Sequence, residues 1–156
     1  MAVRRIRRTR AGDFTLRIPP PERDILVGVP QMLRAVLEQD DRSDPVVRRL
    51  FPSAFLDDEA AATEFDSVVR DDLMAGRLAA IETMERTLQA ARLTEEEVEA
   101  WLAAMNDLRL VLGVRLAVTE ESTPEDFDHE ESGAAYALYA YLSYLEEDVV
   151  QALSSA

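Results

Sequence analysis

The clearest potential for chemistry lies in the first seventeen residues. This segment contains one acid, Asp13, and six arginines: Arg4, Arg5, Arg7, Arg8, Arg10 and Arg17. Guanidinium groups bind phosphate and carboxylate oxygens, so this segment, which we call the arm, is suited to bind a nucleic acid or an acidic protein surface. Residues 18–156 contain 11 arginines and 30 acids, so the arm is equally suited to the acidic body of its own chain or of a second copy. Both uses stay open.

A second candidate is the pair Asp126 and His129, whose spacing places two metal ligands on one face of a helix. Di-iron bundles require two such motifs and two further carboxylates, and this chain has a single His. The absence of Cys excludes disulfides, thiolate zinc sites and thiol switches. No Ser-His-Asp triad is available unless His129 provides the base. We therefore expect no metal or cofactor, and a short helical turn that begins at Thr123-Pro124.

Carboxylate pairs are a third candidate, for general acid–base chemistry. Asp71 and Asp72 are adjacent, and adjacent side chains on a helix point about 100° apart, so the two do not face each other. Thr94 and Glu97 form a capping box, which predicts that a helix begins at Glu95. Acids in the first turn of a helix also interact favourably with its dipole. Both groups of acids therefore favour structure over catalysis.

Aromatic residues offer a fourth candidate, a platform on which bases stack. Trp101 lies among Val98, Leu102, Met105 and Leu108 at helical spacing, which predicts a buried core residue instead. The tyrosines of the C-terminal segment are expected to close the core with their hydroxyl groups at its rim.

The N-terminal element that carries the arginines is predicted as a β-hairpin within residues 2–18, with Gly12 in its turn. Phe14, Leu16 and Ile18 alternate with polar residues. A lone hairpin is marginally stable in water, so we expect this apolar face to dock onto helices.

The remaining elements are predicted as helices from apolar residues at helical spacing. They cover about 19–39, a short helix capped by Asp44, then 58–91, 95–112 and 132–153. Pro30 is expected to kink or split the first of these. Gly76 is expected to be a break or a close crossing in the longest helix, and Gly113 the end of the next.

The predicted fold is mainly α, with five or six helices packed as a bundle around the long helix and a small N-terminal β-hairpin laid against it. We expect a single domain over residues 1–156. Its parts are the hairpin arm (1–18), a helical core (19–118), an acidic loop (119–132) and a C-terminal helix (133–156).

The composition of the chain limits the possible classes of function further. The chain is 47% apolar and 31% charged, which favours a folded core over disorder. It has no apolar run long enough to span a bilayer and no signal segment, so we expect a cytoplasmic protein without membrane contact. A net charge of −14 repels nucleic acid, so any nucleic-acid binding is expected to use the arm alone.

From Trp101 to Glu121 the sequence resembles the actinobacterial family called domain of unknown function 2017. The resemblance extends to the Arg-Arg-x-Arg-Arg-Thr opening, to residues 70–78 and to the aromatic C-terminal segment. It implies a small cytoplasmic protein, and some members carry the label of oxidative-stress transcriptional regulator. It assigns no chemistry to the motif residues, for which we expect structural roles: Asp71, Asp72, Arg77, Trp101, Asn106, Asp107, Arg109 and Arg115. In particular, Arg109 and Arg115 are expected to pair with Asp71 or Asp72.

These observations predict a non-enzymatic protein-interaction module, regulatory by family resemblance, that acts without a cysteine switch. Its partner is expected to be another protein or a second copy of itself, bound through Arg4, Arg5, Arg7, Arg8 and Arg10. The alternative is a nucleic-acid binder that uses the same arm. A metal-dependent enzyme comes third.

Overall fold

Helices dominate the structure, as the sequence predicts. The computed structural model describes residues 4–52 and 59–155, with the backbone alone over 59–66. The elements, in chain order, are β1 (Ile6–Arg8), β2 (Phe14–Leu16), α1 (Pro20–Gln39), α2 (Pro45–Leu50), α3 (Glu59–Thr87), β3 (Arg92–Leu93), α4 (Glu95–Leu116), the 3-10 helix η1 (Pro124–Phe127) and α5 (Glu130–Ser154).

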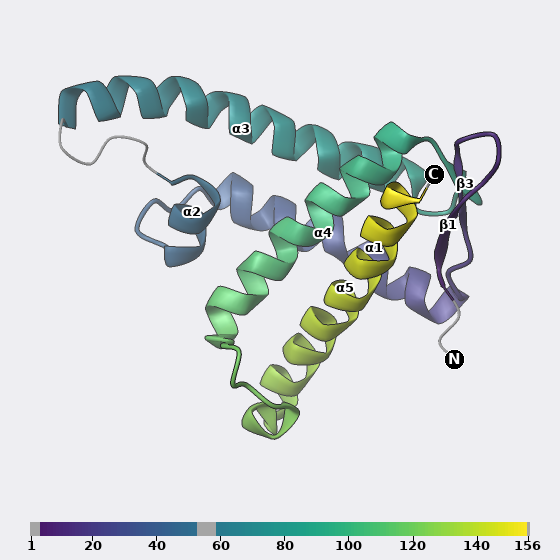
Figure 1. The fold of residues 1–156 in the computed structure, drawn as a ribbon. Coiled ribbons are helices and arrows are strands. Elements are labelled where there is room, and N and C mark those ends of the chain that lie inside the picture. The colour runs from purple at the N-terminus through teal and green to yellow at the C-terminus, as the bar shows by residue number, and fades with distance from the viewer. Residues whose placement is uncertain (1–3, 53–58, 156) are drawn as a thin grey trace.

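Helix α4 connects the parts of the bundle, because it contacts α1, α2, α3 and α5. Figure 1 shows the long α3 across one side of the molecule and α4 and α5 side by side, joined by the loop that contains η1. The strands lie beside the C-terminal end of α5, and β1 contacts that helix. The mainly-α prediction with a small N-terminal β-element is confirmed.

The predicted hairpin forms, and a third strand extends it. Ile6 lies opposite Leu16, and both are buried together with Phe14 on the face toward the helices. Gly12 has a φ of 96° in the turn, a conformation that glycine adopts without a steric penalty. Strand β3 pairs with the other edge of β2, where Leu93 lies opposite Phe14. The sequence missed β3 because two residues are too few to show an alternating pattern.

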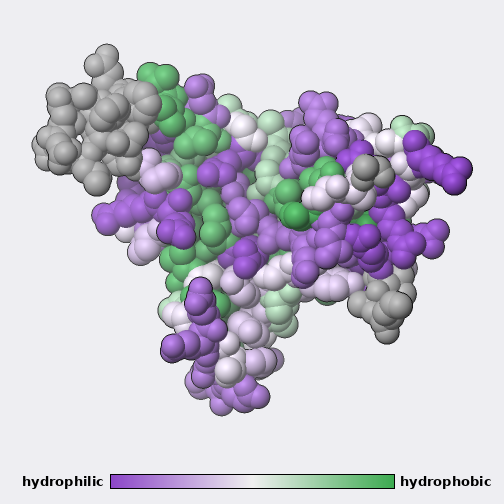
Figure 2. All heavy atoms as spheres, in the orientation of Figure 1, coloured by the Kyte–Doolittle hydropathy of each residue, from purple (hydrophilic) through white to green (hydrophobic). Residues whose placement is uncertain are grey.

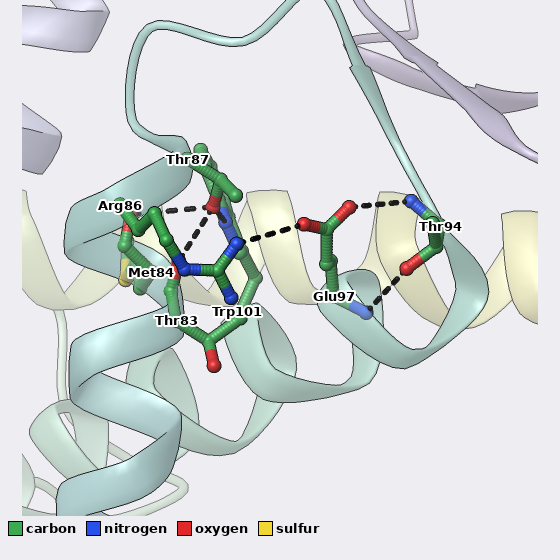
Figure 3. Close-up of polar contacts among 7 residues, drawn as sticks. All are labelled: Thr83, Met84, Arg86, Thr87, Thr94, Glu97 and Trp101. Carbon is green, nitrogen blue, oxygen red and sulfur yellow. Dashed lines mark hydrogen bonds and ion pairs between the residues drawn. The ribbon is translucent and has the colours of Figure 1, made fainter.

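The helix caps follow the sequence. The Asp44 side chain accepts a hydrogen bond from the Val46 N–H at 2.9 Å at the start of α2. At the start of α4, the Thr94 hydroxyl accepts from the Glu97 N–H, and the Glu97 carboxylate accepts from the Thr94 N–H (Figure 3). The predicted capping box is therefore confirmed.

The expected breaks in the helices do not occur. Helix α1 continues through Pro30, so the predicted split is wrong and the alternative, a kink, stays a prediction. Gly76 lies inside α3, and no atom lies within 4 Å of the point that a Cβ would occupy there, so it marks neither a break nor a close crossing. Helix α4 continues past Gly113 and ends at Leu116, and the residue that caps it, Ala117, adopts the left-handed conformation. Packing of long apolar faces here overrides the helix propensity of single residues.

Trp101 is fully buried where α4 faces α3, as predicted. Its Nε1–H donates to the Thr87 hydroxyl at 2.7 Å, and that hydroxyl donates to the Thr83 carbonyl at 2.8 Å (Figure 3). The polar group of the indole is thus satisfied inside the core. Trp101 is a core residue and offers no exposed ring for stacking.

The predicted acidic loop contains a helical turn. Pro124 opens η1, and the Asp126 carboxylate accepts a hydrogen bond from the Thr123 N–H at 2.9 Å. Helix α5 begins at Glu130, two residues before its expected start. None of the helices in the described part of the chain is long and apolar enough to cross a membrane.

Candidate interaction surfaces

The arginine arm is folded onto its own chain. The Arg5 side chain makes two hydrogen bonds with the Glu22 carboxylate on α1, at 3.2 and 2.8 Å. Its backbone N–H donates to Asp148 Oδ2 on α5 at 2.6 Å. The Arg5 guanidinium holds the pKa of Glu22 below its ordinary value. One residue of the arm therefore joins the sheet to both α1 and α5.

Arg4 and Arg8 hold the arm to the last turn of α5. Arg4 Nη2 donates to Gln151 Oε1 at 2.7 Å. The Arg8 guanidinium donates to the carbonyl oxygens of Ala152 and Leu153, at 3.3 and 3.0 Å. The last carbonyls of a helix lack partners within it, and a cation there also interacts favourably with the helix dipole. These contacts stabilise the end of α5.

The outer face of the sheet carries exposed arginines. Arg7 lies opposite Thr15, which in turn lies opposite Arg92 on β3. Arg17 shares this face because it follows Thr15 by two positions along an extended chain. Arg7 and Arg17 are exposed, and the Arg92 side chain is 66% exposed. We call Arg7, Arg17 and Arg92 the basic sheet face.

The five arginines predicted to bind a partner therefore divide into two groups. Arg4, Arg5 and Arg8 are engaged within the chain, which was the structural alternative for the arm. Arg7 and Arg10 are exposed. The sequence missed the contribution of β3 to the basic sheet face because only strand pairing brings that residue beside the arm.

On the side of α4 that faces α3, Asp107 forms a buried ion pair with Arg77. Both carboxylate oxygens of Asp107 accept hydrogen bonds from Arg77 Nη1 at 2.7 Å. Arg77 Nη2 donates to the carbonyl of Leu50, at the end of α2, at 2.8 Å. Burial raises the pKa of Asp107, and the Arg77 charge opposes that rise. The pair joins α2, α3 and α4.

Phe51 extends this cluster toward α1. The guanidinium carbons of Arg70 and Arg77 lie 4.3 and 5.5 Å from the centroid of the Phe51 ring. Arg70 also forms an ion pair with Asp40, the left-handed residue that ends α1. Sequence reasoning missed Arg70 as a tertiary contact, although its spacing of two turns from Arg77 places both on one face of α3.

The predicted pairing of Arg109 and Arg115 with Asp71 or Asp72 is wrong. Asp71 and Asp72 are exposed on α3, and neither forms an ion pair with the described residues. Arg115 Nη2 instead lies 3.7 Å from Asp44 Oδ2, at the start of α2. The prediction of structural ion pairs for these arginines holds, but with other partners.

Arg109 faces α5 because it follows Asp107 by two positions, about 200° around the helix. Its Nε donates to Ser143 Oγ at 2.6 Å and lies 3.5 Å from Glu146 Oε2. Its guanidinium carbon is 5.1 Å from the centroid of the Tyr139 ring. Asp107 and Arg109 thus make contacts on opposite sides of α4, with α3 and α5 respectively.

Glu146 is only partly satisfied by these contacts. The residue is 8% exposed, and its Oε1 accepts no hydrogen bond from the described residues. Burial is the main cause of a raised Glu146 pKa, the negative charge of Asp107 adds to it, and Arg109 opposes it. The Glu146 carboxylate therefore has unused capacity to accept a hydrogen bond.

A groove of about 440 Å³ lies between α4 and α5, beside this carboxylate. Three of its lining residues are acids and none is basic. One face of each helix lines it: Glu99, Leu102, Ala103 and Asn106 from α4, and Glu146, Glu147 and Val150 from α5. On the face that carries these helices, Figure 2 shows hydrophobic patches among hydrophilic residues. We call this feature the α4–α5 groove.

The candidate metal pair is placed apart from further ligands. Asp126 is engaged with the backbone of η1, and His129 is exposed where α5 begins. Among the side chains of residues 4–52 and 67–155, no three His, Asp or Glu are grouped so that they could hold a metal ion.

A model of the family described as domain of unknown function (DUF2017) matches residues 3–153. The chain belongs to this family. The resemblance expected from the sequence is therefore confirmed.

Relatives of this DUF2017 chain include the oxidative stress regulator AosR of Mycobacterium tuberculosis (strain ATCC 25618 / H37Rv), which is 31% identical over 127 residues. AosR of Mycobacterium bovis (strain ATCC BAA-935 / AF2122/97) matches with the same identity over the same length. Each alignment covers 70% of this chain and 58% of the relative, so the match spans little more than half of the relatives' length. No solved structure matches the chain.

The motif residues of this DUF2017 chain fall into two groups. Five make tertiary contacts in the fold: Arg77, Trp101, Asp107, Arg109 and Arg115. The other three, Asp71, Asp72 and Asn106, are exposed, and Asn106 lines the α4–α5 groove.

Proposed function

We propose that this chain is a regulatory protein that acts by binding another protein and catalyses no reaction of its own. The regulatory part rests on relatives that are named oxidative stress regulators. Because the match spans 58% of those relatives, their role is carried to this chain as a proposal.

The main support for protein binding is the arrangement of the charged residues in the core and at the surface. The buried acids Asp107 and Glu146 lie beside Arg77 and Arg109, which supports structural roles for them. At the surface, the basic sheet face groups three exposed arginines, and the groove between α4 and α5 combines three acids with an apolar lining. Grouped charge of one sign beside apolar surface favours recognition of a partner protein.

Regulation by a thiol switch is excluded for this chain because it contains no Cys. A response to oxidative stress would therefore use a route other than cysteine chemistry in this chain.

The second candidate function is nucleic-acid binding, and the exposure of Arg7, Arg17 and Arg92 favours it. Their side chains lie on one face and are open to phosphate contacts, although Arg92 Nη1 also lies 3.6 Å from Asp13 Oδ2. Only a few phosphates fit such a small face, and the acidic body opposes binding.

A salt titration on the full chain separates the two functions. The chain is used to capture partners from a native actinobacterial lysate, and in parallel is titrated with fluorescent duplex DNA. We expect captured protein to persist as salt rises. DNA affinity is expected to fall with log salt by about 0.9 log unit per neutralised phosphate. Capture of no protein, together with salt-sensitive DNA binding, would replace the proposed function with the second one.

A matched pair of variants assigns any DNA binding to a surface. Arg7→Gln, Arg17→Gln and Arg92→Gln together remove the charge of the basic sheet face. Changing the exposed arginines near α2 removes the same charge elsewhere: Arg42→Gln, Arg48→Gln and Arg49→Gln. If DNA is bound through the sheet, only the first variant lowers the slope of the salt titration.

A further inference from the structure

We propose that the α4–α5 groove binds an amphipathic helix of a partner protein, one that carries Arg or Lys beside its apolar face. This inference rests on the proposed function and names the surface and the chemistry of the partner.

The shape of the groove suits a helix. Residues 99, 102, 103 and 106 of α4 follow the spacing of one helical face, and 146, 147 and 150 of α5 form the facing ridge. The apolar lining comes from Leu102, Ala103 and Val150, and Val150 is 49% exposed. Apolar side chains at helical spacing on a partner would cover these residues, as in other helix-in-groove complexes.

The charge of the groove selects a basic helix. Glu99 and Glu147 are exposed at its rim, and no basic residue lines it. Glu146 adds a carboxylate that is 8% exposed and whose Oε1 accepts no hydrogen bond from the described residues. Oε1 itself is buried, so a guanidinium or ammonium group in the groove is attracted by the combined negative charge of Glu146 and the two rim carboxylates.

Other occupants fit less well. Phosphates and anionic lipids are repelled by the three carboxylates of the groove. A second copy would need an exposed basic amphipathic helix. Helix α2 has Arg48 and Arg49, but its apolar residues Val46, Val47 and Leu50 are buried in its own core.

The test uses the full chain and three fluorescein-labelled peptides of about 18 residues, or five helical turns. One peptide has Leu and Ala along one face and Arg beside it. The second has Glu in place of each Arg, and the third has the composition of the first in scrambled order. Fluorescence anisotropy is expected to show binding of the basic amphipathic peptide at least about tenfold tighter than either control. Equal binding of the basic and acidic peptides would overturn the proposal.

Two matched substitutions locate the binding. Ala103→Arg places a long cation in the groove, whereas Ala137→Arg places the same side chain on an exposed part of α5 that does not line it. We expect a loss of about tenfold or more in peptide affinity for Ala103→Arg and no change for Ala137→Arg. Unchanged affinity in a folded Ala103→Arg variant would overturn the proposal.

Glu146→Gln provides a readout that a merely structural residue would not give. Loss of the charge is expected to weaken binding of the basic peptide while the variant stays at least as stable as the natural chain. Unchanged peptide affinity would remove Glu146 from the site.

Failure of this inference is distinguishable from failure of the proposed function. A lysate protein that binds the Ala103→Arg variant as well as the natural chain would support the proposed function and overturn the groove as its site. Lack of any captured protein by the natural chain would overturn the proposed function itself.

Discussion

Two arginine–acid pairs on opposite sides of α4 differ in how completely the acid is satisfied. Toward α3, both oxygens of Asp107 accept hydrogen bonds from Arg77 at 2.7 Å. Toward α5, Arg109 reaches only Oε2 of Glu146, at 3.5 Å, and Oε1 has no partner among the described residues. Both acids are buried, so the arginine–carboxylate pair is fully hydrogen-bonded on the α3 side and only partly satisfied on the α5 side.

This difference suggests that the α3 side of α4 stabilises the fold, whereas the α5 side is available to bind a partner. The α3 side also buries Trp101, whose N–H is satisfied by Thr87. The α5 side keeps an open groove with acidic and apolar lining and a carboxylate of which one oxygen has no partner among the described residues. Substitutions on the first side should therefore lower stability, and those on the second should alter binding with little loss of stability.

The largest expected effect is that of Trp101→Ala. The side chain is fully buried, and the α3–α4 interface cannot close completely around the missing ring. We expect the free energy of unfolding to fall by about 3–5 kcal/mol. Urea denaturation followed by far-UV circular dichroism measures it. Stability near that of the natural chain would mean that α3 and α4 do not pack through this residue.

Arg77→Leu should come next, with a loss of about 3 kcal/mol, because it leaves the Asp107 carboxylate buried without a counter-charge. The same denaturation experiment measures it. Adding Asp107→Asn to Arg77→Leu removes the stranded charge and should recover part of the loss, in a double-mutant cycle. A loss below about 1 kcal/mol for the single variant would contradict a dominant role for this pair.

The sequence predicts the helices better than the contacts between them. Periodic apolar residues and local caps, such as Asp44 and the Thr94–Glu97 box, depend on neighbours within a few positions, and these predictions are confirmed. The burial of Trp101 follows from the same periodicity. The expected split at Pro30 and the expected end at Gly113 fail because tertiary packing decides whether a helix continues.

The candidate site could be predicted only in part. Arg77, Asp107 and Arg109 form ion pairs, as the expected structural roles require, but a single sequence does not show which helix faces which. The assignment of Arg109 to α3 therefore fails. The groove and the free oxygen of Glu146 arise from two helices that are far apart in the chain. No local spacing signals them.

Glu146→Gln should have the next effect, in the opposite direction. Burial raises the Glu146 pKa, so the folded chain holds a proton there that the unfolded chain has lost at the same pH. Between the ordinary value of 4.5 and the raised pKa, the contribution of Glu146 to the stability of the natural chain therefore falls as pH increases. At neutral pH, Gln should raise the free energy of unfolding by about 1 kcal/mol, because burying an incompletely hydrogen-bonded carboxylate costs more than burying an amide.

The measurement is urea denaturation of both chains at several pH values. The difference between them should shrink as pH falls toward 4.5 and disappear below it, where Glu146 is neutral in both states. Carboxyls with lowered pKa values, such as Glu22 and Glu85, are common to both chains and cancel in the difference. A variant less stable than the natural chain at neutral pH would mean that Arg109 satisfies Glu146 after all.

The smallest expected effect is that of Arg115→Gln, which tests whether burial or mere pairing distinguishes the two sides of α4. Arg115 also projects from α4 to an acid, Asp44, but its side chain is 52% exposed and the atoms are 3.7 Å apart. An exposed pair of this kind contributes about 0–1 kcal/mol, so we expect a change at the low end, further reduced by salt. Asp44→Ala is the matched control, because it also removes the cap on α2 and should cost about 0.5–2 kcal/mol. If Arg115→Gln cost as much as Arg77→Leu, pairing alone would determine stability, and the contrast between the sides of α4 would lose its physical basis.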